Sequence, residues 1–383
     1  MNFILIMGIV LILGALSRKT ADRVGVPVLV GFIFIGILIG NWYKFEDKNT
    51  AMYLCNFALL LIIFCGGFQT DYAAVKPVLA VSASLSAAGT LLTALVSGLF
   101  AYYILHLEFY QAALLGSVIA STDSASVFSA LRSKQTELKN KLNTVLEVES
   151  SSNNPFAHIL TTMFLALALG SSQNIFSLLI PQITLGLLSG FVFAKLGQIF
   201  INRINLDIDS IYGVILCGVA FIIYGAAVQI GGNGFLAVYV GGVILGNVRL
   251  TYKGYLTRLS SAISMLLQIT LFLVLGVLCA SSLRAVFGDA LVFALFLFFI
   301  ARPVLMWLLM KPFRYSLSEI ALVSWAGFRG ASSIVFAVIV LTAGLPYSEY
   351  VFSVVFFVCL LSVTIQGSLI FPLAKKLKLL DDD

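Results

Sequence analysis

Long apolar segments follow one another along the whole chain, and they constrain its fold more than any other feature. Runs of about 18 or more mostly apolar residues are each long enough to cross a hydrocarbon core roughly 30 Å thick. Only 10% of the 383 residues are charged, whereas a soluble protein carries about 25%. The sequence therefore predicts an all-α polytopic membrane protein.

Hydropathy and helix-breaking residues together predict about thirteen membrane spans. An orientation with the N-terminus outside and the C-terminus inside places most of the 23 Lys and Arg residues on the cytoplasmic side, as the positive-inside rule requires. The outer side then holds only Lys44, Lys48 and Arg284. The predicted spans cover residues 2–17, 24–41, 51–68, 75–104, 110–131, 142–170, 174–202, 208–229, 233–248, 259–281, 285–311, 316–344 and 350–374.

The chain shows no sign of division into separate domains. No Gly/Ser-rich or Pro-rich linker interrupts the membrane region, so residues 1–383 are predicted to form a single transmembrane domain. The last residues read K-K-L-K-L-L-D-D-D, which is too short to fold alone. We therefore expect no soluble regulatory domain.

An internal repeat is visible in two pairs of segments that share one offset. Gly31–Asn41 resembles Ala237–Asn247, which begins 206 residues further along the chain. The same offset places Ala120–Ser126 (A-S-T-D-S-A-S) on Ala326–Ser332 (A-G-F-R-G-A-S) without a gap. Two matches at one offset indicate a duplicated unit.

The repeat predicts the transport architecture. On the predicted topology the second span runs outward and the ninth runs inward, so the repeats, approximately residues 24–170 and 230–374, are inverted. Inverted repeats are common in secondary transporters, whose sites form at broken helices near the middle of the membrane. The offset places Asp123 opposite Arg329.

Asp123 is the strongest candidate for an ion-binding residue. An ionisable group inside a membrane costs about 2.5–3.5 kcal/mol on insertion scales and usually lines an ion or substrate path. Thr122, Asp123 and the freed backbone carbonyls around them supply hard oxygen ligands for an alkali cation. A desolvated carboxylate can bind either a proton or a cation. The alternative is a structural Asp123 that is neutralised by Arg329.

A second polar group follows in the next span. Glu149 and Asn153 are one helical turn apart, as are Ser150 and Asn154, so the two pairs occupy adjacent faces of one helix. An unpaired charge at this depth is costly, and we therefore expect Glu149 to form an ion pair with Arg302.

Depth along the helices places these groups together. At 1.5 Å per residue, Asp123, Asn154, Glu149, Arg302 and Arg329 fall in one layer a few turns thick. Arg329, between Gly327 and Gly330, either neutralises a helix break or guides cations.

Few other residues carry chemistry. His158 lies one turn beyond Asn154 and is a possible proton site, although a hydrogen-bonded helix histidine is the plainer interpretation. The five Cys residues lack metal or disulfide spacing. No Walker motif, H-E-x-x-H, nucleophile elbow or nucleotide-binding loop is present, so the sequence favours neither an enzyme nor a cofactor, and we expect no nucleic-acid partner.

Together these motifs resemble the cation:proton antiporter family, and most closely the NhaP/CvrA-type bacterial sodium or potassium/proton antiporters. The likeness rests on T-D-S-A, E-S-x-x-N-x-P, R-P and G-F-R-G-A, and it covers essentially the whole chain. The resemblance implies a thirteen-helix inverted-repeat fold with broken crossing helices, a homodimer, and elevator-like alternating access. It also implies an ion site built from Thr122, Asp123, Ser150 and residues 153–154, with a Glu149–Arg302 pair.

The sequence departs from the family pattern at two positions. The motif that ends Asn-Asp in the family ends Asn153-Asn154 here, and Cys65 stands where many relatives carry an acidic residue. We therefore expect a secondary antiporter of the bacterial inner membrane that exchanges K⁺ or Na⁺ for H⁺, with activity weakened by Asn154. The alternative is a non-exchanging relative, which conducts ions, regulates another protein or is inactive in transport.

Overall fold

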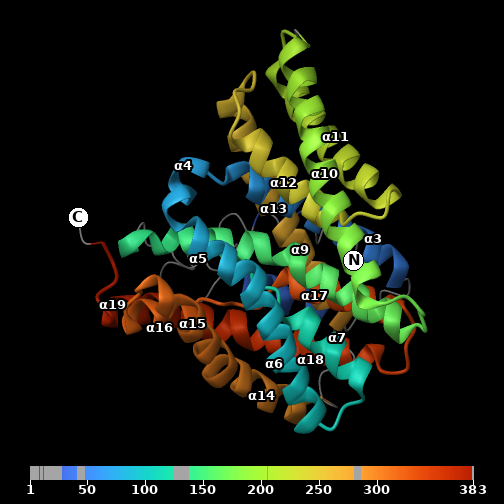
Figure 1. Ribbon diagram of the computed structural model, residues 1–383, viewed down its shortest axis with the longest axis vertical. Coiled ribbons are helices and arrows are strands. Elements are labelled where there is room, and N and C mark those ends of the chain that lie inside the picture. Colours follow the sequence, from blue (N-terminus) through green and yellow to red (C-terminus); the bar gives the residue numbers. More distant parts are fainter. Residues whose placement is uncertain are drawn as a thin grey trace.

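The computed structural model describes residues 8, 12, 28–40, 48–123, 138–204, 206–279 and 286–381, and this part of the chain is helical without any strand (Figure 1). An isolated antiparallel bridge joins Leu138 to Leu380. The predicted span 2–17 lies almost entirely outside the described residues. The helices are α2 (Val28–Gly40), α3 (Lys48–Gln69), α4 (Tyr72–Val75), η1 (Lys76–Val78), α5 (Leu79–Ser84), η2 (Leu85–Gly89), α6 (Thr90–Tyr103), α7 (Phe109–Ile119), η3 (Lys139–Lys141), α9 (Leu142–Ala168), α10 (Ile175–Arg203), α11 (Asp209–Gln229), α12 (Gly234–Gly246), α13 (Lys253–Cys279), α14 (Phe287–Phe296), η4 (Leu297–Ala301), α15 (Arg302–Met310), η5 (Lys311–Phe313), α16 (Leu317–Trp325), α17 (Ala331–Thr342), α18 (Ser348–Leu361), η6 (Ser362–Gln366) and α19 (Gly367–Lys376).

Seven continuous helices in the described part are long and apolar enough to cross a membrane, and each falls on a predicted span. Four shorter apolar helices also fall on predicted spans. The seven are Asn49–Gln69, Tyr72–Tyr103, Ile175–Arg203, Asp209–Gln229, Lys253–Leu278, Phe287–Phe313 and Ser348–Lys376. The prediction of a polytopic helical membrane protein is thus confirmed.

Two of the predicted spans are interrupted in their middle. In the span predicted at 110–131, α7 ends at Ile119 and the chain leaves the helix through residues 120–123. In the span predicted at 316–344, residues 326–330 separate α16 from α17. Ser, Thr and Asp compete for backbone hydrogen bonds and weaken a helix locally, and Gly interrupts one at an entropic cost. The first break contains Ser121, Thr122 and Asp123, and the second contains Gly327 and Gly330.

The long helix α9 runs through the centre of the molecule, with the breaks of α7 and α16–α17 beside it (Figure 1). Its first turns pack into one apolar cluster through Leu142, Val145 and Leu146. Its later turns pack into a second cluster, which includes Ala157 and Leu160. The polar residues 149–154 therefore lie where two apolar cores meet.

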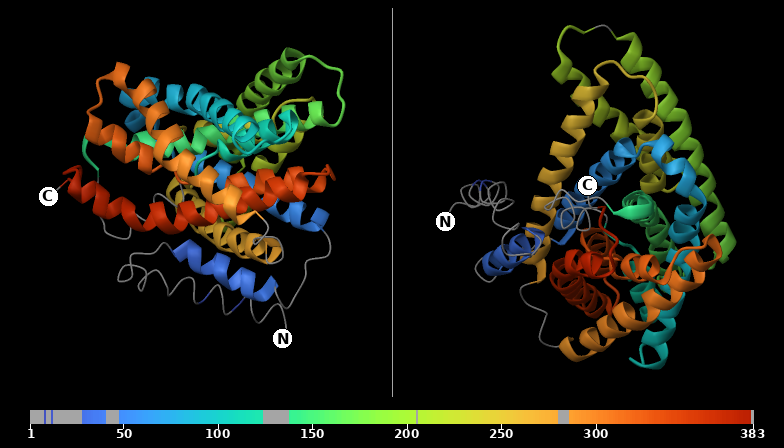
Figure 2. Two further views of the ribbon diagram at one scale, coloured as in Figure 1. Left: turned by 90° about the horizontal axis from the view of Figure 1, so that it is seen from below. Right: turned by 90° about the vertical axis from the view of Figure 1, so that its left-hand side faces the viewer.

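The remaining helices form the surroundings of this centre. α10 and α11 extend away from it at the top of Figure 1, and α12 packs against both of them and against α3. α2 packs along α13, which Figure 2 shows in its left view.

Glycine allows some of these helices to touch backbone to backbone. A Cβ atom added at Gly242 of α12 would lie 2.4 Å from the Phe64 carbonyl oxygen of α3, and one added at Gly67 would lie 2.5 Å from the Tyr239 oxygen. Small residues at such crossings let helix backbones approach closely within membranes. The α3–α12 contact therefore requires glycine on both sides.

This contact predicts a stability difference between two glycine substitutions. Gly242→Ala should lower the unfolding temperature in detergent, because the backbone of α3 has to move and overpacking costs about 1–3 kcal/mol. Gly225→Ala on α11 is the control, since its Cβ would meet nothing within 4 Å. An equal effect of both substitutions would show that α3 and α12 do not pack in this way.

Candidate functional site

The two helix breaks lie side by side in the interior. The Asp123 backbone N–H donates to the Phe328 carbonyl oxygen over 2.9 Å, which joins the segments 120–123 and 327–330. Thr122 and Arg329 are fully buried, and Asp123 is 8% exposed. The juxtaposition brings Asp123 and Arg329, which the internal repeat pairs in sequence, into one site.

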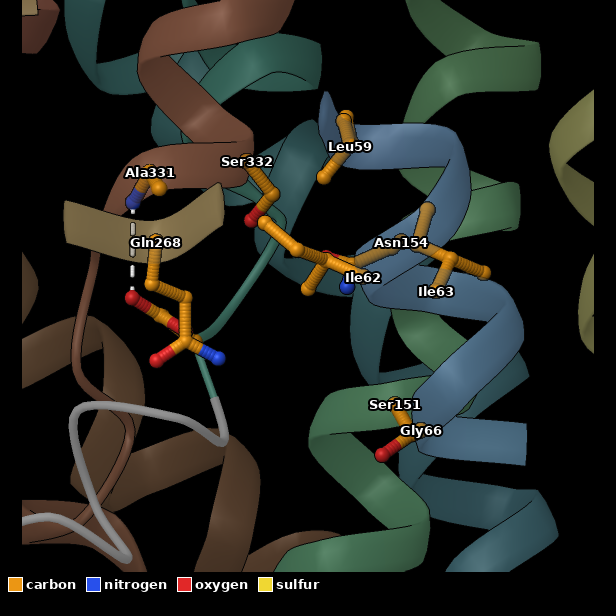
Figure 3. Close-up of a pocket in the computed structure, with 10 residues that line it drawn as sticks. Leu59, Ile62, Ile63, Gly66, Ser151, Asn154, Gln268, Ala331 and Ser332 are labelled. Atoms are coloured by element: carbon orange, nitrogen blue, oxygen red, sulfur yellow. Dashed lines mark hydrogen bonds between the residues drawn. The ribbon is translucent and has the colours of Figure 1, made fainter. Parts of the chain in front are cut away.

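Each break supplies the group that the other helix end needs. Arg329 Nη1 donates to the carbonyl oxygens of Ala120 (2.8 Å) and Ser121 (2.9 Å), at the C-terminal end of α7. Asp123 Oδ2 accepts from the Ala331 N–H (3.4 Å) at the start of α17, which the dashed line in Figure 3 marks. A helix carries partial negative charge at its C-terminus and positive charge at its N-terminus. The cation and the carboxylate therefore cap opposite helix ends reciprocally.

The two glycines beside Arg329 make room for charged neighbours. A Cβ atom at Gly330 would lie 2.2 Å from Asp123 Oδ2, and one at Gly327 would lie 2.4 Å from Arg302 Nε. At Gly330 the added atom would also lie 2.6 Å from Asp123 Cβ. Turning the Asp123 carboxylate alone would therefore not relieve the clash. The two glycines of the G-F-R-G motif therefore leave the space that the side chains of Asp123 and Arg302 occupy.

Glu149 of α9 and Arg302 of α15 form the predicted buried ion pair. Arg302 Nη2 lies 3.0 Å from Glu149 Oε1, and the two side chains are 3% and 1% exposed. Ser150 Oγ donates to Glu149 Oε2 over 3.2 Å. Asn153 Nδ2 donates to Glu149 Oε1 (3.3 Å) and to Thr122 Oγ1. Several donors therefore satisfy one buried carboxylate, as a desolvated charge requires.

A small cavity opens beside Asp123, with a water-accessible volume of about 30 Å³. A buried water needs roughly 10–15 Å³ on this measure, so the cavity is large enough for about two waters or one small ion. Figure 3 shows the residues that surround it, from α3, α9, α13 and the start of α17. They are Leu59, Ile62, Ile63, Gly66, Asp123, Ser151, Asn154, Gln268, Ala331 and Ser332.

Asn154 and Ser332 line the cavity and are connected through Ser121, which is not among the lining residues. Ser121 Oγ donates to Asn154 Oδ1 over 2.7 Å and lies 2.5 Å from Ser332 Oγ. Ser333 Oγ donates to the Ser121 carbonyl oxygen. Carboxylate, amide and hydroxyl oxygens are the ligands that hard cations prefer. Asn154 thus lines the cavity, and its carbonyl oxygen belongs to this hydrogen-bonded series.

The remaining predicted residues lie around Glu149 or beyond the cavity and do not line it. Thr122 and Asn153 bond to each other and to Glu149. Ser150 contacts Glu149, whereas its neighbour Ser151 lines the cavity. His158 bonds to Asn233 Nδ2 at 2.7 Å and is not among the cavity residues.

Four site residues were not among the sequence candidates: Ser121, Ser151, Gln268 and Ser332. Ser121 and Ser332 belong to the two repeated segments. The internal repeat was therefore the sequence signal that could have identified them. Gln268 is an uncharged polar residue in an apolar helix, and its sequence context indicates nothing about the site.

Three helices around the site contain a π-helical segment, namely η2, η4 and η6. Arg302 directly follows η4. Ser362 of η6 accepts from the Arg329 backbone N–H over 2.9 Å and donates to Gln366 Oε1. π-Helical segments are rare and occur frequently at functional sites, and here η4 and η6 adjoin the two buried arginines.

Broken helices that meet at buried ionisable groups are typical of secondary transporters. The chain belongs to the sodium/hydrogen exchanger transmembrane family, whose pattern it matches over residues 8–376. The family assignment agrees with the resemblance seen in the sequence motifs.

Individual relatives match almost the whole chain. The K(+)/H(+) antiporter NhaP of Alkalimonas amylolytica is 33% identical over 98% of this chain and 67% of its own length. The K(+)/H(+) antiporter NhaP2 of Shewanella baltica is 34% identical over 96% of this chain and 65% of its own length. The chain thus spans about two thirds of the length of these relatives.

A solved structure has the same fold. The sodium proton antiporter MjNhaP1 from Methanocaldococcus jannaschii superimposes with a TM-score of 0.84 at 24% identity, covering 97% of each chain.

The buried ion pair predicts non-additive stability losses. Glu149→Gln and Arg302→Gln should each destabilise the protein by about 3–5 kcal/mol, because each leaves a buried charge without its partner. The double variant should lose less than the sum in thermal unfolding, as expected for residues in direct contact. Lys195→Gln is the control, since Lys195 contacts Gln198 at the exposed surface. Additive losses for Glu149 and Arg302 would contradict the pair.

Proposed function

We propose that this protein is a secondary antiporter that exchanges K⁺ or Na⁺ for H⁺ across a membrane, with Asp123 as the ion carrier. The observation that carries the proposal is a buried carboxylate at a helix break, beside a water-sized cavity lined by Ser151, Asn154 and Ser332. Ionisable residues inside membranes usually mark ion paths. The family assignment supports the same activity.

Asp123 binds one occupant at a time. The N-terminus of α17 favours its ionised form, and the ionised oxygens attract a cation into the cavity. A proton on the carboxylate removes that attraction, so cation and proton compete for one group. When Asp123 is exposed in turn to the two sides of the membrane, it carries a cation in one direction and a proton in the other. Competition for one carboxylate thereby produces exchange.

The identity of the transported cation rests on the relatives. The two K(+)/H(+) antiporters match at 33% and 34% identity. The structural neighbour is a sodium proton antiporter. Oxygen ligands suit both K⁺ and Na⁺, so the cavity chemistry does not distinguish them. The higher sequence identity to the two K(+)/H(+) antiporters favours K⁺ for this chain.

The proposal includes the membrane architecture predicted from the sequence. It comprises thirteen spans with the N-terminus outside and the C-terminus inside, inverted repeats at about 24–170 and 230–374 within one domain, and a homodimer in the bacterial inner membrane. The reciprocal contact between segments 120–123 and 327–330 supports the repeats, because equivalent segments meet there. Bacterial relatives support the location.

Removing the carrier carboxylate should stop exchange. Asp123→Asn keeps the side-chain shape and an oxygen for the Ala331 N–H, but it has no proton to exchange at neutral pH. In proteoliposomes we expect K⁺- and Na⁺-driven proton movement at the level of protein-free vesicles. Asp289→Asn, which removes a carboxylate bonded to Tyr350 away from the site, should retain activity. Exchange by a folded Asp123→Asn variant would refute the assignment.

Restoring the second carboxylate should strengthen exchange. Asn154→Asp is nearly isosteric and still accepts from Ser121 Oγ. Two neighbouring carboxylates repel each other, and either a cation or a proton relieves that repulsion. We therefore expect weak exchange in the parent and a several-fold increase in Asn154→Asp, measured by dye-reported proton flux at matched protein amounts.

The control for this change is Asn174→Asp, because Asn174 caps α10 at the surface and Asp caps equally well. A fully active parent with an unchanged Asn154→Asp variant would show that the amide at 154 is a neutral replacement. Flux that follows voltage without a counter-gradient would show conduction in place of exchange.

A further inference from the structure

A second polar cluster lies on α9, one helical turn beyond the cavity. His158 Nδ1 is 2.7 Å from Asn233 Nδ2, and Asn233 Nδ2 also donates to Gln182 Oε1 over 3.3 Å. Thr162 Oγ1 donates to the same Gln182 oxygen over 3.1 Å. These four residues connect α9 to α10 and to the start of α12.

The α10 and α12 sides of this cluster form one unit. The Asn233 N–H donates to the Gln182 carbonyl oxygen over 2.9 Å. A Cβ atom at Gly186 of α10 would lie 3.0 Å from the Asn233 oxygen, so the two backbones are in close contact. The His158–Asn233 bond therefore joins the helix of the ion site to a rigid neighbouring pair.

The orientation of the Asn233 amide is set by the helix that it caps. Asn233 is 3% exposed and is the N-cap residue of α12, where its Oδ1 accepts from the Leu236 N–H over 2.9 Å. A backbone N–H can only donate, so the oxygen has to face Leu236. The Asn233 NH₂ group consequently faces His158.

This orientation determines the protonation state of the imidazole. The NH₂ group of Asn233 donates, so His158 Nδ1 has to accept with a free lone pair. Nδ1 has that lone pair only in the neutral ring that carries its hydrogen on Nε2. A protonated ring would present a second donor to Asn233, and the bond would be lost.

The other contacts of His158 are with neutral groups. Its ring centroid lies 4.7 Å from that of Phe235 on α12 and 5.4 Å from that of Phe336 on α17. Tyr224 of α11 lies behind Phe235, with ring centroids 5.3 Å apart. Four ionisable groups of the surrounding elements have contacts away from His158: Glu149 with Arg302, Asp123 with Ala331, Tyr239 with Ser152, and Lys195 with Gln198.

We propose that His158 and Asn233 form a proton-sensitive latch between α9 and α12. The latch is closed while His158 is neutral, and protonation of the ring releases it. α9 carries Glu149, Asn153 and Asn154, so the latch controls the attachment of the site helix to the α10–α12 unit. This regulatory contact goes beyond the exchange proposed above, and its test does not depend on ion flux.

The first measurement reads the ring itself. The chain contains two histidines, and the other, His106, is exposed, so His106→Gln leaves His158 as the single histidine. In ¹⁵N-histidine NMR of the full chain in nanodiscs, we expect the Nε2–H tautomer at neutral pH. Observation of the Nδ1–H tautomer would overturn the latch.

The second measurement reads the attachment of α12. Hydrogen–deuterium exchange of residues 234–238, corrected for the intrinsic effect of pH, should become faster as the imidazolium signal of His158 appears. His158→Gln should remove this pH dependence, because glutamine does not titrate. The same acid-dependent increase in His158→Gln would overturn the proposal.

A variant that replaces the donor facing His158 with an acceptor provides an independent check. Asn233→Asp keeps an oxygen to cap α12 but faces His158 with an acceptor, which bonds to the protonated ring. We expect α12 to keep or gain protection in acid in this variant. Loss of protection equal to that of the parent would contradict the latch, even if His158→Gln failed to fold.

Discussion

The structure depends on two buried helix ends that cap each other. A helix that stops inside a membrane leaves backbone groups without partners, and no water is available there to satisfy them. Arg329 satisfies the carbonyls at the end of α7, and Asp123 faces the first N–H group of α17. Because each break supplies the cap of the other, neither helix can be interrupted alone. The paired breaks place an ionisable carboxylate beside a cavity in the interior.

Two buried arginines and two buried carboxylates surround the paired helix breaks. Arg302 pairs with Glu149, which also accepts from hydrogen-bond donors, and Arg329 and Asp123 lie on the two adjacent breaks. Asp123 is the carboxylate that also reaches the cavity. A proton and a monovalent cation add the same charge when they bind to it. In the proposed exchange, either occupant therefore has the same electrostatic outcome, and a second occupant is unfavourable.

Much of this organisation followed from the sequence, and the rest depended on packing. The spans, the break at Asp123 and the Glu149–Arg302 pair follow from hydropathy, backbone chemistry and the cost of burying a lone charge. Spacing showed that Ser150 and Asn154 share a helix face, but it did not show that Ser151 would reach the cavity. Which face of α9 meets the cavity is set by α3, α13 and α17. The Asn233 contact of His158 was likewise not predictable, because it joins positions 75 residues apart through the N-cap of α12.

The proposed function places the transported cation at Asp123, where the two helix breaks lie side by side. The most direct measurement is an experimental structure with thallium(I), a heavy substitute for K⁺, determined at alkaline and at acidic pH. We predict thallium density in the cavity between Asp123, Ser151 and Asn154 at alkaline pH, and its loss in acid as Asp123 takes up a proton. Thallium bound elsewhere, or density at Asp123 that does not change with pH, would contradict the claim.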